Sequence, residues 1–165
     1  MVNLKIIVRY EEKYFLPNNH NEVFTELYLS AGDICFPNVG WSDFTDTVLQ
    51  WWANELINIR HTINHSTKLY FKDGPFWLEV FKDDKMELRI NCINSRGNKD
   101  IVELTVECGY VEFLQVLLDA IKEFMYILHF SYPDKKVEKF YQPHFTKLSS
   151  QLKDIITELM QNDDA

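Results

Sequence analysis

Strands with two chemically different faces are predicted by residues 68–108, KLYFKDGPFWLEVFKDDKMELRINCINSRGNKDIVELTVEC. Side chains alternate across a strand, so Leu78 and Val80 share one face while Trp77 and Phe81 share the other. Large aromatic side chains are costly to leave in water. We therefore expect a sheet with one aliphatic face and one face of aromatic residues and carboxylates, which either the protein's own helices or another molecule covers.

Two earlier strands and three helices flank this region. The pattern predicts strands at 2–10, 22–30, 67–72, 76–82, 85–93 and 100–108, and helices at 42–63, 111–130 and 145–160. Ser42 is a good N-cap for the first helix, and the short turns between the later strands favour antiparallel neighbours. We expect an α+β fold in one domain over residues 1–165, with residues 134–142 as its weakest point. Its single antiparallel sheet of about six strands packs with one long central helix and two C-terminal helices.

Composition and charge narrow the class of partner. The chain has 165 residues, of which 46% are hydrophobic, and its formal net charge is -8 with a pI near 5.1. This balance argues against direct binding to nucleic acid, because a phosphate backbone attracts basic proteins. An acidic surface favours encounter with a basic protein, although the same charge also serves solubility.

The sequence predicts a cytoplasmic protein that is not anchored in a membrane. The three cysteines, Cys35, Cys92 and Cys108, are widely spaced and form no CxxC pair, which suits a reducing compartment. The first residues lack the features of a secretory signal. Charged residues also interrupt the most apolar stretch, residues 110–130, too often for a membrane span.

No catalytic, metal or cofactor site is predicted. His61 and His65 have the spacing of a zinc-binding helix, but Thr62 stands where such a helix carries Glu, and a fraying helix end explains the pair better. Cys92 falls on a row that faces the core, as does Cys108, and the apolar surroundings of Cys35 favour a bystander thiol. The chain carries no nucleophile elbow, phosphate-binding loop or dinucleotide fingerprint, so we expect no enzyme activity and no cofactor.

The outward rows of the strands form the candidate partner-binding surface. Aromatic anchors ringed by carboxylates suit a protein interface. The candidate residues are Glu26, Tyr28, Trp77, Glu79, Phe81, Glu87, Arg89, Glu103 and Glu107. A second interpretation stays open, in which the aromatic residues form another core layer under the C-terminal helices.

Two segments carry a resemblance to a known class of proteins. They are residues 41–46, WSDFTD, which lead into Trp51 and Trp52, and the hairpin at 71–76, FKDGPF. Through these segments, which cover under half of the chain, it resembles the small cytoplasmic immunity proteins that accompany bacterial polymorphic toxins. The resemblance implies a single acidic α+β domain that binds the toxin domain of its own strain and blocks it, often by covering an active site. It assigns no binding residue by motif.

Three functions follow as hypotheses. The first is a non-catalytic immunity protein that occludes a basic toxin domain through the acidic and aromatic surface. The second is a small-molecule-binding or enzymatic domain with a pocket between the 42–63 helix and the sheet, lined by Trp51, Trp52, His61 and Cys35. The third is a structural adaptor or homodimer that buries the aromatic face against a second copy.

Overall fold

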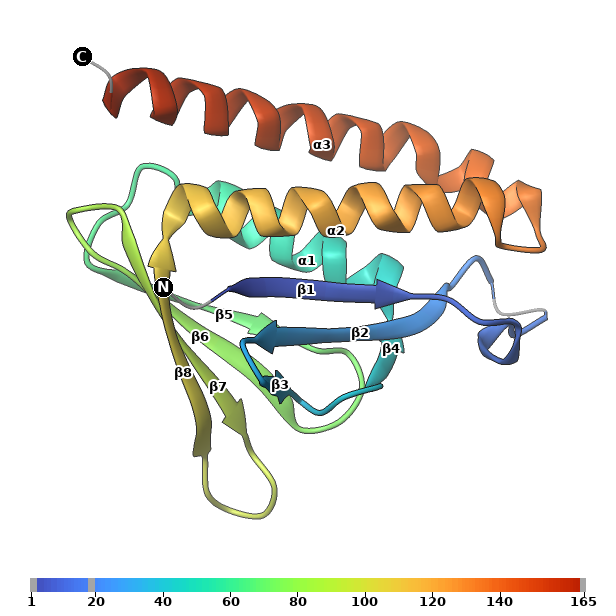
Figure 1. Ribbon diagram of the computed structural model, residues 1–165, viewed down its shortest axis with the longest axis horizontal. Coiled ribbons are helices and arrows are strands. Elements are labelled where there is room, and N and C mark those ends of the chain that lie inside the picture. The colour runs from blue at the N-terminus through green and yellow to red at the C-terminus, as the bar shows by residue number, and fades with distance from the viewer. Residues whose placement is uncertain (1–2, 18–19, 164–165) are drawn as a thin grey trace.

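Two antiparallel sheets of four strands each pack against three helices in the computed structural model, which describes residues 3–17 and 20–163 (Figure 1). The strands are β1 (Leu4–Arg9), β2 (Phe24–Ala31), β3 (Ile34–Phe36), β4 (Ser42–Phe44), β5 (His65–Tyr70), β6 (Phe76–Lys82), β7 (Glu87–Asn94) and β8 (Ile101–Gly109). The helices are α1 (Thr45–Asn58), α2 (Tyr110–Phe130) and α3 (Lys135–Asp163), with a short 3-10 helix, η1, at Glu12–Tyr14. The expected α+β class is therefore confirmed.

The first sheet is built around β2. Strand β1 pairs with one edge of β2, whereas β3 and β4 share the other edge, each opposite a different part of the strand. Ile6 lies opposite Leu29, and both side chains point into the core. Helix α2 packs along β1 on this inner side. Strand β1 is thus an edge strand whose inner face is covered.

The second sheet is a meander in the order β5-β6-β7-β8, with an irregularity in the β7/β8 register between Cys92 and Ile93. Its inner row includes Leu78, Val80 and Ile90, which have no exposed surface. These residues join the same core cluster as the inner side chains of the first sheet. Both sheets therefore turn their aliphatic faces toward the helices.

Helix α3 forms the outermost layer, because it packs antiparallel on α2, which in turn lies over β1 (Figure 1). The core beneath is rich in aromatic side chains, including fully buried Trp52, Phe113, Phe124 and Phe145. Within the described residues, no helix combines the length and the apolar character that a membrane span needs.

The turn between β5 and β6 ties the two sheets together. The amide of Asp73 donates to the buried carboxylate of Asp43 in β4, with N–O distances of 3.1 and 3.2 Å. Trp41 packs over the turn so closely that a Cβ on Gly74 would lie 2.9 Å from its ring, and Gly74 has a φ of +74°. A side chain at this position is thus excluded by both space and backbone conformation.

Three sequence-based expectations are wrong. The strands form two sheets rather than a single one of about six strands. Ser42 is not an N-cap, because residues 42–44 pair with β2 and the helix begins only at Thr45. The last helix begins at Lys135 and includes Pro143. It includes residues 135–142 because buried Val137 and Tyr141 continue its apolar stripe.

Candidate functional site

The outer face of the second sheet is the leading candidate site. We call it the open face, and its side chains are those of Ser66, Lys68, Tyr70, Trp77, Glu79, Phe81, Glu87, Arg89, Asn91, Ile93, Val102, Thr105 and Glu107. They alternate with the core residues that face the helices. Most of the outer residues are exposed or half-buried, including Tyr70 at 48% and Val102 at 53% exposure. The aromatic rows therefore face away from the protein's own core.

Strand register arranges the open face in three cross-strand rows. The first row is Tyr70, Trp77, Ile93 and Val102; the second is Lys68, Glu79, Asn91 and Thr105; the third is Ser66, Phe81, Arg89 and Glu107. The middle row is hydrogen-bonded, because Asn91 Nδ2 donates to Glu79 Oε1 at 3.1 Å and Thr105 Oγ1 donates to Asn91 Oδ1 at 2.8 Å. A polar ladder thus separates two rows that carry aromatic rings.

Trp77 is held in place from several sides. Its indole Nε1 donates to Ser95 Oγ at 2.8 Å, the ring lies 6.1 Å from that of Tyr70, and Lys68 Nζ lies 5.0 Å from the ring centroid. Ile93 beside it is only 5% exposed although it is outside the core cluster, so its neighbours on the open face cover it. An aromatic side chain fixed before binding loses little conformational entropy in a complex.

A shallow concavity of about 310 Å³ lies at one end of the open face, around Phe81. The other lining residues are Asp83, Glu87, Leu88, Arg89 and Glu107. Arg89 Nε lies 3.4 Å from Glu107 Oε1, and the Asp83 carboxylate accepts the backbone N–H groups of Lys85 and Glu87. A partner's cationic side chain would find here an aromatic ring beside carboxylates, which favours cation–π contact.

Six of the nine residues predicted to bind a partner lie together on the open face: Trp77, Glu79, Phe81, Glu87, Arg89 and Glu107. Glu103 is exposed at the irregularity of β8 and belongs to none of the three rows. Its carboxylate instead accepts a hydrogen bond of 2.8 Å from Asn94.

Glu26 and Tyr28 do not belong to this surface, which corrects the prediction. Both lie on β2 in the first sheet, where Tyr28 is 7% and the Glu26 side chain 13% exposed. The Glu26 carboxylate lies close to Gly40 and accepts a hydrogen bond of 3.4 Å from the Tyr14 hydroxyl, and Leu27 donates its N–H to Trp41 O at the edge of β2. Strand alternation identifies the outward side of β2 but carries no information on segments elsewhere in the chain that bury it.

Lys68 and Tyr70 are functional candidates that sequence reasoning missed. Both lie on the row of β5 that alternates with buried Leu69. The sequence could have identified them, because side chains alternate along a strand and residues 68 and 70 therefore lie on the face opposite Leu69.

The pocket expected beside the 42–63 helix does not form from its four predicted residues. Trp52 has no exposed surface, and its Nε1 donates to Tyr70 O at 2.8 Å. Trp51, the next residue in α1, is 44% exposed. His61 is exposed beyond the end of α1, and Cys35 is half-buried on β3 in the first sheet. Trp52 thus belongs to the core, whereas Trp51 and His61 lie at the surface.

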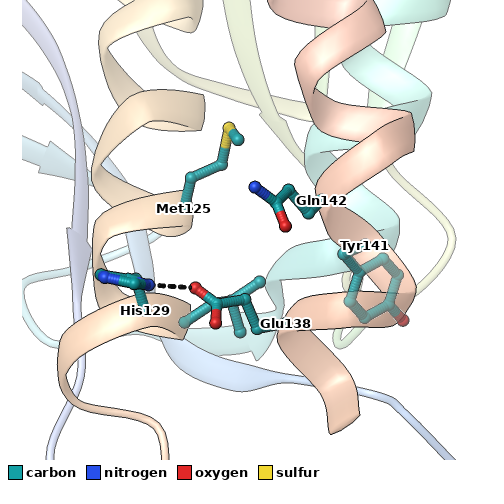
Figure 2. Close-up of a pocket in the computed structure, with 6 residues that line it drawn as sticks. Met125, His129, Glu138, Tyr141 and Gln142 are labelled. Atoms are coloured by element: carbon teal, nitrogen blue, oxygen red, sulfur yellow. Dashed lines mark hydrogen bonds and ion pairs between the residues drawn. The ribbon is translucent and has the colours of Figure 1, made fainter. Parts of the chain in front are cut away.

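A second concavity, of about 140 Å³, lies between α2 and α3 and is lined by Met125, Leu128, His129, Glu138, Tyr141 and Gln142 (Figure 2). His129 and Glu138 are paired across it, with 2.6 Å between Nδ1 and Oε2. The Tyr141 hydroxyl is bonded to Asn21 and Asp46. Lys135 Nζ donates to the carbonyls of Leu128 and His129, where α2 ends. These contacts hold the end of α2 against the start of α3. The contact between His129 and Glu138 is therefore explained by the packing of the two helices.

Two of the three thiols, those of Cys92 and Cys108, are buried in the core. Burial raises the pKa of Cys92 to about 12 and that of Cys108 to about 12, so both thiols stay protonated. Among residues 3–17 and 20–163, no three His, Cys, Asp or Glu side chains are grouped so that they could hold a metal ion.

Comparison with known proteins identified no relative: no family model, no curated protein and no solved structure matches this chain.

Proposed function

We propose that this protein is a non-catalytic immunity protein that neutralises a basic toxin domain by docking its open face over it. The observation that carries the proposal is the accessibility of Trp77 and Phe81, which lie outside the core cluster on a sheet face that points away from the helices. The likeness of residues 41–52 and 71–76 to polymorphic-toxin immunity proteins supplies the biological setting, a bacterial cytoplasm.

The chemistry of the open face supports tight, stoichiometric binding. Trp77 and Phe81 are the kind of side chain that dominates interface energies, and each sits beside a polar or charged neighbour that can form the rim. Carboxylates outnumber basic groups there by three to two, and by five to two once Asp83 and Glu103 at its borders are included. A nuclease domain, whose substrate is a polyanion, has the basic surface that such a face complements.

The test uses the protein encoded by the reading frame beside this gene. Its terminal domain is expressed in a host cell with and without this protein, and growth and 1:1 binding are measured. We expect the terminal domain to arrest growth and the intact protein to restore it. A neighbour that is harmless, or whose toxicity is not relieved, contradicts the proposal.

Variants locate the contact. The double charge reversal Glu87→Lys with Glu107→Lys should slow association about tenfold at low salt and weaken its dependence on salt, because charges mainly affect the encounter. Asp154→Lys, an exposed carboxylate on α3, is the matched control and should leave association unchanged. Equal association rates for the double variant and the intact protein at low salt would exclude the open face as the contact.

A further inference from the structure

The outer edge of β1 pairs with no other strand in the described part of the chain. Strand β1 pairs only with β2, so the backbone N–H and C=O groups on its other side have no strand partner among residues 3–17 and 20–163. Such an edge is a template for another extended segment. This edge belongs to the first sheet and is separate from the open face.

A groove runs beside this edge, between β1 and α2. The two elements lie side by side and run in the same direction (Figure 1). The groove has two hollows, of about 180 and 440 Å³. The first lies between residues 4–7 and the pair Val116 and Asp119, and the second between residues 6–10 and the helix surface around Glu123 and Tyr126.

The spacing of the hollows matches a strand. Asp119 and Glu123 are one helical turn apart, which is about 6 Å at 1.5 Å per residue. Alternate side chains of an extended segment are about 6.8 Å apart. A strand paired with β1 would therefore direct successive inward side chains into successive hollows.

The charges on the two sides of the edge differ in sign. Toward α2, the groove carries the exposed carboxylates of Asp119 and Glu123 above apolar Ile6 and Ile127. On the outward side of β1, Lys5 is exposed and the Arg9 side chain is 64% exposed. An incoming strand fits best with basic or aliphatic side chains facing α2 and acidic or hydroxyl side chains facing outward.

We propose that the β1 edge binds an extended segment of another protein, in which lysine, arginine or aliphatic residues alternate with acidic or hydroxyl residues. A second copy of this chain is the poorer occupant. An antiparallel two-fold pairing of two β1 strands sets each α2 beside its own copy. Asp119 and Glu123 would then approach the same carboxylates, and Lys5 and Arg9 the same cations.

The probe for this site is a capped octapeptide in which every second residue is lysine or valine and the residues between are threonine or glutamate. Its binding to the intact protein is followed by fluorescence anisotropy. Two N-methylated forms are compared, each with methyl groups on one alternating set of backbone nitrogens. Because alternate N–H groups of a strand point to opposite edges, we expect one form to lose about tenfold or more in affinity while the other binds as the parent does.

Protein variants complete the test. Glu123→Lys should weaken octapeptide binding about tenfold, whereas the control Asp154→Lys should not. Glu87→Lys, on the open face, should also leave octapeptide binding unchanged. The proposal for the β1 edge can therefore fail or succeed independently of the proposal for the open face. Equal affinity of the two methylated forms would show adsorption without strand pairing. That result, absence of saturable binding, or a stable dimer whose β1 amides are already protected from hydrogen exchange would each overturn the proposal.

Discussion

The hydroxyl of Tyr141 in α3 lies 2.8 Å from Oδ2 of Asp46 in the first turn of α1. The same hydroxyl is 2.6 Å from the carbonyl of Asn21, and Asp46 Oδ1 accepts the N–H of Val23 at 2.7 Å. One buried phenol and one buried carboxylate thus join the outer helix, the central helix and the segment that leads into β2. Burial raises the pKa of Asp46, and its hydrogen bonds offset only part of that effect.

Replacement of Asp46 should change how stability depends on pH. The folded protein holds the Asp46 proton to higher pH than the unfolded chain, whose reference pKa is 3.8. The group therefore stabilises the fold fully below that value, and the contribution is lost as the pH rises through the folded-state pKa. Asp46→Asn removes this titration, so its free energy of unfolding relative to wild type should increase as the pH rises above the reference value of 3.8.

Urea unfolding at several pH values measures this difference, because both proteins share all other titrating groups. Asp154→Asn, at an exposed site on α3, is the control and should keep a constant offset from wild type. A constant offset for Asp46→Asn as well would contradict a raised pKa for Asp46.

Loss of the Tyr141 hydroxyl should destabilise the protein without disturbing its packing. Tyr141→Phe keeps the ring, which lies 5.8 Å from that of Phe145, but leaves the Asp46 carboxylate with one donor fewer. We expect a loss of about 1–3 kcal/mol in the free energy of unfolding, since a buried charged acceptor stays partly unsatisfied. Tyr126→Phe, at a residue 56% exposed, should change it by less than about 0.5 kcal/mol. Similar effects of the two substitutions would contradict this role for the hydroxyl.

Lys82 closes the end of α1. Its side chain is fully buried, and Nζ donates to the carbonyls of Ile59, Arg60 and Thr62 where the helix ends. Lys82→Met keeps the length of the side chain but removes all three donors, so we expect a loss of about 2–4 kcal/mol. Thermal or urea unfolding measures it, with Lys85→Met at an exposed turn residue as the control. A loss of less than about 0.5 kcal/mol would mean that water replaces the ammonium group at these carbonyls.

Local patterns predicted most elements because each depends on its own residues. Alternation of Leu78 and Val80 with Trp77 and Phe81 was sufficient to place β6 at residues 76–82, as observed. The number of sheets could not be predicted in this way, because alternation does not determine which strands pair. Ser42 illustrates this limit, since its pairing with Glu26 of β2 overrides its preference for a helix N-cap.

The sequence also predicted which residues of the candidate site share a strand face, but not which of these faces are buried. Trp77, Phe81 and Arg89 share a sheet face because of strand period alone, and the structure places them so. Tyr28 satisfies the same rule within its own strand, yet it is buried on the other sheet. Burial by other parts of the chain is a tertiary property that no local spacing encodes.

The three thiols should differ in reactivity, because Cys35 is less buried than Cys92 and Cys108. Cys35 is half-buried on β3, whereas burial raises the pKa of both Cys92 and Cys108 to about 12. Iodoacetamide at neutral pH should therefore alkylate Cys35 first in the native protein, because the thiolate is the reactive form. Mass spectrometry of the digested protein identifies the labelled residue. Cys35→Ser should nearly abolish labelling until denaturant is added, and equal labelling of the other two thiols would show that the core opens under native conditions.

Substitutions of Trp77 and Trp52 should have different effects on stability and on partner binding. Trp52 is fully buried in the core, so Trp52→Ala should cost about 3–5 kcal/mol of stability. Trp77 lies outside the core cluster, so Trp77→Ala should cost no more than about 1.5 kcal/mol of stability, from its hydrogen bond to Ser95 and its contact with Tyr70.

If the open face holds the partner, Trp77→Ala should weaken that complex by at least about 2 kcal/mol. Unfolding measurements and calorimetry with the neighbouring gene's terminal domain give the two numbers. A Trp77→Ala protein that is strongly destabilised, or that binds as wild type does, would show that this ring serves the fold and not the interface.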